Sequence, residues 1–157
     1  WIAATWLQLP EKDTVRLYVD GDFSSMADLR YWFDMLTLRP DLQAYGYSKA
    51  WPLFTSYKGP WPTNYLLNLS SGSKHSISDK LLSVPIVRGE FVYVDIPKRL
   101  QGRYSDPAYK LAVRQSAAAQ GIQRPFLCPG LCGSCTIKGH ACGMPKFSGI
   151  PIVIGAH

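Results

Sequence analysis

The chain has 157 residues, of which 46% are hydrophobic and 18% charged. That length and balance suit one globular domain with a single core and leave no tract polar enough to be disordered. The longest uncharged apolar runs are too short to span a bilayer, and the sequence shows no basic-then-apolar leader, so we expect a cytoplasmic protein with no membrane partner. The net charge of +6 suits an anionic partner such as nucleic acid, although the basic residues are dispersed and Lys98, Arg99 and Arg103 form the densest group.

The N-terminal third predicts a β-α-β unit. Several large apolar residues open the chain, and we expect residues 1–157 to be a single domain from the C-terminal part of a longer protein. Residues 14–20 alternate β-forming residues and predict a strand, which Gly21 ends. A helix follows, capped by Ser24 or Ser25 and ended at Pro40, because its large apolar residues recur at the spacing of one buried face. Residues 42–48 predict the second strand.

The rest of the chain predicts further strands and one more long helix. Residues 51–63, rich in Trp and Pro, predict a rigid loop. Asp106 and Pro107 have the residue types of an N-cap and a first helical position, which predicts a helix to about Gln120. The remaining predicted elements are strands over 64–70, 84–88, 91–94, 126–127 and 150–154, and a short turn or helix over 76–82.

Alternation of strands and helices indicates an α/β fold with a mainly parallel sheet, in which ligands gather at the carboxyl ends of strands. Several predicted strands end in polar residues: Asp20 and Asp22, Lys49, and Ser70 and Ser71. The two aspartates could bind a divalent cation or act as acid–base groups, or they could only cap the turn into the helix. Lys49 could hold an anion or be an ordinary exposed lysine, and the Ser70–Ser71 stretch could donate to an anion although it is no P-loop.

All four cysteines, Cys128, Cys132, Cys135 and Cys142, lie within a loop that we place at residues 126–145. Disulfides at the shortest of these spacings would close very small loops, so the pattern indicates a metal or iron–sulfur site. A [4Fe-4S] cluster and Zn²⁺ both remain open from the spacing, and His140 could replace one thiolate around zinc.

Two segments carry a resemblance to a known family. The stretch Val15-Arg-Leu-Tyr-Val-Asp-Gly-Asp-Phe-Ser-Ser, with Tyr31-Trp32 and then Pro40-Asp-Leu-Gln-Ala-Tyr-Gly-Tyr-Ser-Lys49, resembles the phage and plasmid "gene product 88" family. The family pattern is similar to R-x-H-x-S-G-D-F, then a helix with a Trp, then P-D-x-x-x-Y-x-Y-T-K. Tyr18 stands where the family has His. The Cys-Pro start, the close cysteines and the last strand before His157 resemble the C-terminus of that family.

Members of that family look distantly similar to radical SAM proteins, which implies a partial (β/α)-barrel with a C-terminal cysteine-rich metal loop. The spacing of Cys128, Cys132 and Cys135 matches the C-x3-C-x2-C with which radical SAM enzymes hold three irons of a [4Fe-4S] cluster and leave the fourth open. Cys142 offers a fourth thiolate, so the resemblance implies a closed, auxiliary-like cluster. The upstream cysteine group of radical SAM proteins has no counterpart here, and an upstream segment or another protein would have to supply it.

Three functions follow as expectations. The first is an iron–sulfur protein of phage or mobile-element type in the cytoplasm of a bacterial host, with or without enzymatic activity. The alternative is a zinc-binding module that interacts with nucleic acid during mobile-element replication. The third is an interaction protein that docks a partner on the Trp- and Pro-rich stretch at 51–63.

Overall fold

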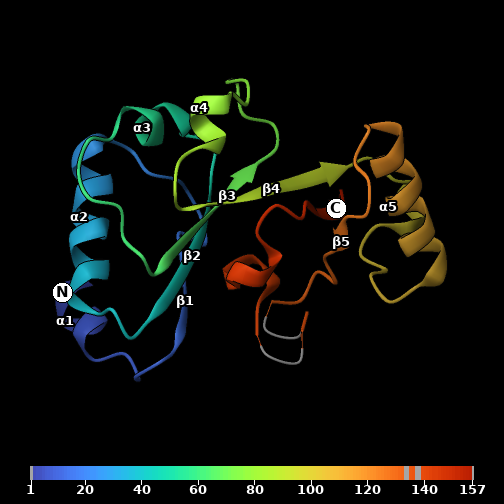
Figure 1. Cartoon of the computed structure of the whole chain (residues 1–157). Coiled ribbons are helices and arrows are strands. Elements are labelled where there is room, and N and C mark those ends of the chain that lie inside the picture. The colour runs from blue at the N-terminus through green and yellow to red at the C-terminus, as the bar shows by residue number, and fades with distance from the viewer. Residues whose placement is uncertain (1, 133–134, 137–138, 157) are drawn as a thin grey trace.

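The computed structural model describes residues 2–132, 135–136 and 139–156. In this part of the chain six strands form one sheet in the order β1-β2-β3-β4-β6-β5, and every neighbouring pair is parallel. The sheet curls into an open half-barrel (Figure 1). The strands are β1 Thr14–Leu17, β2 Gln43–Ser48, β3 Tyr65–Ser70, β4 Val87–Val94, β5 Phe126–Leu127 and β6 Ile152–Gly155. The α/β class, the parallel sheet and the partial barrel are therefore confirmed.

Four helices cover the outer face of the N-terminal half of the sheet: α1 Ile2–Leu7, α2 Met26–Leu38, α3 Trp51–Ser56 and α4 Asp79–Leu82. Ser25 is the N-cap of α2, and its hydroxyl accepts a hydrogen bond from the Asp28 amide at 3.1 Å, as the capping pattern predicts. Leu29, Phe33 and Leu36 point from α2 onto the sheet and are almost fully buried. We call this apolar layer the outer core.

The long helix α5, Pro107–Ala119, packs on the other half of the sheet. Asp106 caps it through a bond from the Ala108 amide at 2.8 Å, and Pro107 stands in its first turn, both as predicted. Tyr109, Val113 and Ala117 bury one face of this helix against strands β4 and β6. No helix in the described part of the chain is long and apolar enough to cross a membrane.

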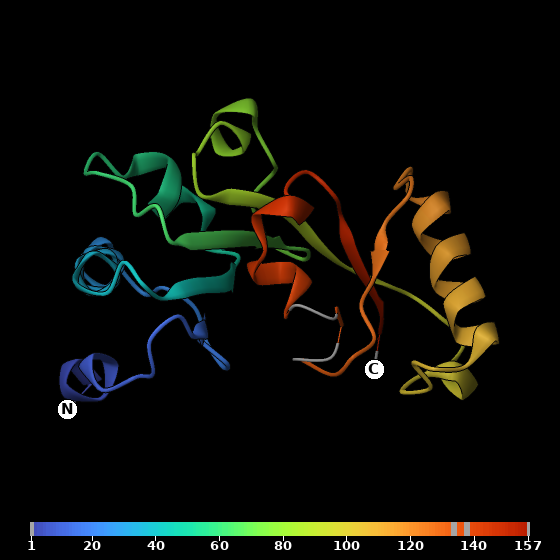
Figure 2. The same cartoon turned by 60° about the horizontal axis from the view of Figure 1, so that its bottom comes forward.

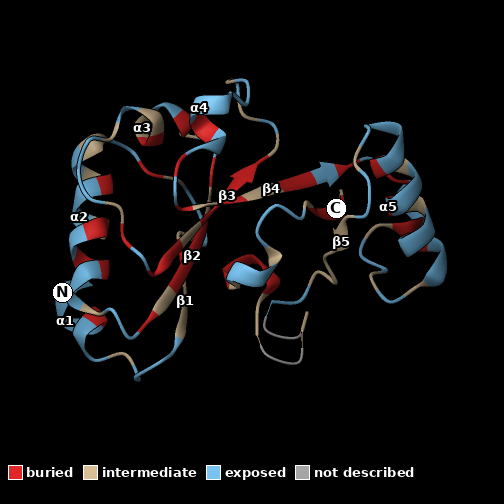
Figure 3. Cartoon of the chain, viewed as in Figure 1, coloured by how far each residue is buried: buried red, intermediate tan, exposed pale blue. Residues whose placement is uncertain are grey.

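The described residues of the C-terminal segment, 128–132, 135–136 and 139–151, lie against the inner, concave face of the half-barrel (Figure 2). It contains two 3₁₀ turns, Ala141–Gly143 and Pro145–Phe147. Its buried residues Ala141 and Cys142 pack with aromatic and aliphatic side chains of the sheet, and Figure 3 shows the first turn buried and the second largely exposed. We call this layer the inner core. The segment therefore closes one side of the half-barrel, as the helices close the other.

Several predicted boundaries were wrong. Residues 51–56, expected as loop, form α3, since Pro52 stands in the first turn of the helix where its missing N–H costs nothing. The strands expected at 84–88 and 91–94 are one strand, β4, in which Gly89 (φ +144°) absorbs a register shift against β3. The first strand ends at Leu17 because Tyr18 adopts a positive φ of 55°. The closing strand begins at Ile152, two residues later than expected.

Candidate functional site

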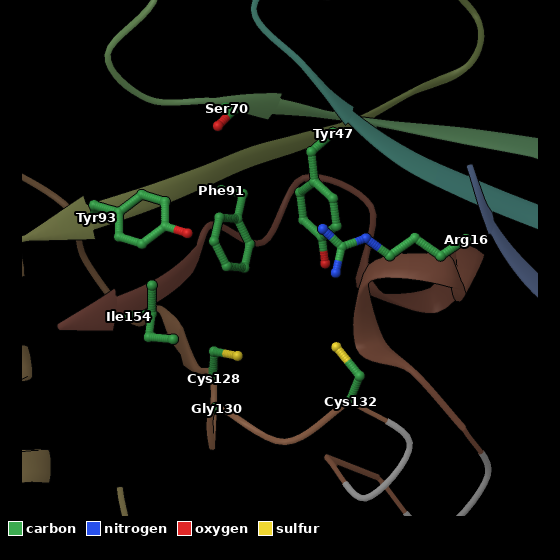
Figure 4. Close-up of a pocket in the computed structure, with 9 residues that line it drawn as sticks. All are labelled: Arg16, Tyr47, Ser70, Phe91, Tyr93, Cys128, Gly130, Cys132 and Ile154. Carbon is green, nitrogen blue, oxygen red and sulfur yellow. The ribbon is translucent and has the colours of Figure 1, made fainter. Parts of the chain in front are cut away.

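A cavity of about 260 Å³ lies between the inner face of the sheet and the cysteine-bearing segment (Figure 4). Six of its lining residues come from the sheet: Arg16, Tyr47, Ser70, Phe91, Tyr93 and Ile154. The other three are Cys128, Gly130 and Cys132. Most of the sheet residues stand in the last part of their strands, so the cavity lies toward the carboxyl ends, where ligands of parallel α/β folds bind.

The alternation of side chains along each strand explains why these residues face the cavity. Ala44 and Leu67 enter the outer core, and so Tyr45, Tyr47 and Ser70 must point to the inner face. In the same way Val92 points outward to α5 while Phe91 and Tyr93 point inward. The inner face therefore carries aromatic, hydroxyl and guanidinium groups, whereas the outer face is mainly aliphatic and includes Tyr65.

The four cysteines are free thiols; Cys128 and Cys132 line this cavity, whereas Cys135 and Cys142 lie in or against the inner core. Cys128 follows β5 and extends its ladder, since its amide donates to the Val153 carbonyl at 2.8 Å. Cys132 is exposed at the cavity mouth, and Figure 4 shows the sulfurs of Cys128 and Cys132 turned toward the same space. The Sγ of Cys135 accepts a bond from the Ala141 amide at 3.3 Å. Cys142 is buried in the 3₁₀ turn beneath the sheet.

Two of the thiols have raised pKa values. Burial raises the pKa of Cys142 to about 11, against the opposing effects of a hydrogen bond donated by the Tyr47 hydroxyl and of the nearby Arg88 charge. Burial also raises the pKa of Cys128, although the Gly130 amide donates to its sulfur. The other cysteines raise both values further, which shows that the thiols are near enough to repel one another as thiolates. A bound cation would relieve this repulsion.

Zinc and a [4Fe-4S] cluster make different demands on the positions of the four thiols. In the described part of the chain no three His, Cys, Asp or Glu side chains converge closely enough to hold a metal ion. A tetrahedral zinc site would need sulfurs about 3.8 Å apart, given Zn–S bonds of about 2.3 Å. A [4Fe-4S] cluster instead takes one thiolate on each of four irons, and so accepts thiols spread around a larger volume. Two free thiols and no carboxylate line the cavity, and the described residues form no ready-made site for either cofactor.

A buried polar network fixes the segment that carries Cys142. The side-chain amide of Asn68 on β3 donates to the carbonyls of Gly46 (3.0 Å) and Cys142 (3.1 Å). Arg88 on β4 donates to the Asn68 amide oxygen and to the carbonyls of Phe147 and Ile150. Both side chains are about 1% exposed or less, and no acid pairs with Arg88 among the described residues. Together they tie two strands to both ends of the stretch 142–150.

The other predicted site residues have different surroundings. The Asp22 carboxylate accepts bonds from the Ser48 hydroxyl and the Lys49 amide, both at 2.6 Å, and from the Ala50 amide at 3.2 Å. It thus ties the loop after β1 to the end of β2, and Asp20 and Lys49 are exposed beside it. None of these three lines the cavity, and their proposed binding or acid–base roles stay predictions.

Ser70 does line the cavity, but Ser71 uses its hydroxyl to accept a bond from the Tyr93 amide at 2.9 Å. His157 lies outside the described residues. Sequence reasoning missed Arg16 and the pair Asn68 and Arg88. The sequence feature that could have revealed these three residues is the alternation of polar and apolar residues along the strands, which indicates that one face of the sheet is polar.

One of the comparisons with known proteins gave a match. No curated protein and no solved structure matched the chain. A family described as "Gene product 88" matched residues 2–139, which include the whole N-terminal pattern, Cys128, Cys132 and Cys135 and end before Cys142. This match covers most of the 157 residues, so the chain belongs to the Gene product 88 family.

Proposed function

We propose that this protein is an iron–sulfur protein in which Cys128, Cys132, Cys135 and Cys142 hold a [4Fe-4S] cluster against the inner face of the half-barrel. The observation that carries the proposal is the placement of four free thiols on one short segment under the sheet. Cys128 and Cys132 line a cavity whose lining contains no carboxylate, and Cys135 and Cys142 pack in or against the inner core. Thiolate is the ligand that such clusters use. The cluster would supply a one-electron redox centre, and the protein would supply its burial and its hydrogen bonds.

The charges around the cavity support this proposal. A cluster with four thiolates is an anionic group, and the sheet side of the cavity presents Arg16, with Arg88 buried near Cys142. The bonds from Tyr47 to the Cys142 sulfur and from the Ala141 amide to the Cys135 sulfur are the kind that stabilise thiolate and tune a cluster potential.

A relationship to radical SAM proteins is the finer part of the proposal. Its support is the open half-barrel of six parallel strands with a cavity toward the carboxyl ends. Four cysteine ligands would leave no iron free for SAM, so the cluster would serve structure or electron transfer, and an upstream segment or another protein would bring any further cysteines. Free thiols suit a reducing compartment, and we place the protein in the cytoplasm of a bacterial host.

The alternative function is a nucleic-acid-binding module with a structural zinc site. One observation favours it: Lys98, Arg99, Arg103, Lys110 and Arg114 are all exposed on α5 and the stretch that precedes it. This basic surface lies beside the α5 half of the sheet, and Arg103 lines a surface hollow together with Pro129 and Leu131 of the cysteine segment. It predicts affinity for DNA or RNA that falls steeply as salt rises.

Metal content separates the two proposals. Anaerobically purified protein should be brown and contain about four irons and four sulfides per chain. The variant Cys132→Ala should lose most of this iron, because the variant removes one thiolate and leaves the buried packing intact: Cys132 is exposed. The matched control is Leu131→Ala, the neighbouring residue, which is 68% exposed and offers no ligand.

Unchanged iron in the Cys132→Ala protein would remove that cysteine from the site. Colourless protein with about one zinc per chain would contradict the cluster and favour the zinc module. In that case binding of a labelled DNA at low salt, and its loss in a charge-reversed variant of Arg99 and Arg103, would test the alternative.

A further inference from the structure

Arg16 is a partly buried cation at the edge of the cavity, and its guanidinium makes few hydrogen bonds. It projects from β1 into the cavity, where its guanidinium carbon lies 4.7 Å from the centre of the Tyr47 ring (Figure 4). Its Nη2 makes one long bond, 3.4 Å, to the Val19 carbonyl. Its Nε is buried and has no hydrogen-bond partner among the described residues. A buried donor on a charged group is costly to leave unpaired, which indicates that a ligand completes the site.

The rest of the sheet side sets the shape and polarity of that ligand. The rings of Tyr47, Phe91 and Tyr93 pack edge to face in a row, with centroids 4.8 Å and 5.7 Å apart. Ile154 continues this apolar wall, and Ser70 adds a hydroxyl at the rim. No Asp or Glu lines the cavity, so no carboxylate there pairs with Arg16. A wall of rings that ends at an unpaired guanidinium suits a flat, apolar body with one oxyanion.

We propose that the sheet side of this cavity binds a small organic anion, with a planar apolar body against Tyr47, Phe91 and Tyr93 and a carboxylate or phosphate held by Arg16. The volume of about 260 Å³ is slightly below the range of drug-sized sites, which restricts the ligand to a small molecule. The guanidinium fork matches both oxyanions in a bidentate manner, and an ammonium would not.

This inference goes beyond the proposed cluster and stands on other residues. Cys128 and Cys132 line the loop side of the cavity and Arg16 lines the sheet side, so a ligand on Arg16 would lie between the sheet and these two thiols. The competing role for Arg16 is that of a counter-charge to the thiolates alone. That role predicts altered metal retention in an Arg16 variant and no binding of added anions.

The experiment is calorimetric titration of the full chain as isolated, with the metal content of the same sample recorded. Benzoate carries both the flat body and the charge, benzamide has the same shape without charge, and inorganic phosphate has the charge without the body. We expect saturable binding of benzoate at one site. Benzamide should bind at least roughly tenfold more weakly than benzoate, since the charged hydrogen bonds are lost. Phosphate binding that exceeds that of benzoate would identify phosphate as the oxyanion.

Arg16→Gln should lower the affinity for the anion that binds by roughly tenfold or more. Arg16→Lys should restore only part of this affinity because an ammonium group lacks the bidentate geometry of guanidinium. Arg114→Gln, which removes one exposed positive charge from α5, is the control and should bind as the parent does. Equal affinity for benzoate and benzamide, no saturable binding of either anion, or unchanged binding in Arg16→Gln would overturn the proposal. The comparison of benzoate with benzamide and the test for saturable binding use the parent protein, so a folding defect in Arg16→Gln cannot hide a failure of the anion proposal. The recorded metal content shows separately whether the cluster proposal holds.

Discussion

The four cysteines have the same chemistry but very different environments. Cys132 is exposed, Cys128 and Cys135 are partly covered, and Cys142 is 7% exposed beneath Tyr47. Thiolate is the reactive form, and burial raises the pKa of Cys142 to about 11, which keeps it protonated at neutral pH. Reactivity should therefore differ among residues that the sequence cannot tell apart.

We predict that iodoacetamide modifies Cys132 first and Cys142 last in reduced, metal-free protein at neutral pH. Peptide mass spectrometry over a time course gives the four rates, and denatured protein, in which all four should react alike, is the control. Raising the pH toward the pKa of Cys142 should narrow the difference, because the thiolate fraction of this residue then grows. Equal rates in the folded protein at neutral pH would mean that the C-terminal segment does not cover the inner face.

The four cysteines stand out from residue type alone, and their metal-binding role stays a prediction. Four thiols within one short stretch are visible in any sequence, whereas the roles of Asp22 and Arg16 depend on what packs against them. Asp22 has the chemistry of a catalytic group, yet its carboxylate accepts bonds from the end of β2. Arg16 looks like a solvent-facing strand residue until a segment more than 110 residues later closes the cavity around it. Such non-local contacts are not encoded in spacing.

At the scale of elements, the network of Asn68 and Arg88 attaches the C-terminal segment to β3 and β4. We predict that Asn68→Ala lowers the free energy of unfolding by about 3 kcal/mol, since a buried guanidinium nitrogen and two buried carbonyls lose their partner. Urea unfolding measures this loss. The same variant should also speed the alkylation of Cys142, because its carbonyl is no longer held to β3.

Asn64→Ala is the matched control for this experiment. Asn64 is also a buried asparagine, and its amide donates to the carbonyls of Leu36, Arg39 and Leu42 near the end of α2. Its replacement should destabilise the fold to a similar extent without a specific effect on Cys142. If both variants speed the alkylation of Cys142 equally, the network of Asn68 and Arg88 does not specifically attach the C-terminal segment to the sheet.

Elements with strong local signals were predicted and those set by tertiary contacts were not. Asp106 and Pro107 encode the start of α5 in two residues, and Ser25 does the same for α2. By contrast, α3 is a six-residue helix in a Trp- and Pro-rich stretch, and it forms because Trp51 and Phe54 are buried in the outer core. The continuity of β4 through Gly89 likewise depends on its neighbours β3 and β6, not on propensity.

At the scale of the whole molecule, the sheet separates the outer core from the inner core. Trp6, Trp32, Trp51 and Trp61 all lie in or against the outer core. Tyr45 and Tyr47 belong to the inner core, where the C-terminal segment covers them. The emission of these four tryptophans therefore reports on the outer core. Tyr18, Tyr57 and Tyr65 also lie in or against the outer core, so a change in tyrosine near-ultraviolet circular dichroism at constant tryptophan emission reports on the inner core. A ligand that binds only the C-terminal segment should affect these two signals differently.

We predict that removal of the metal by a chelator, under reducing conditions, changes the tyrosine dichroism while the tryptophan emission maximum stays constant. The inner core depends on the segment that carries the ligands, whereas α1 to α4 bury their side chains against the sheet without it. Phe54→Ala is the control for the opposite case, because Phe54 packs edge to face on Phe23 in the outer core and its loss should alter tryptophan emission with the metal still bound. A red shift of tryptophan emission that accompanies metal loss would show that both cores unfold together, and the half-barrel would then need its cofactor to fold rather than only to close its inner face.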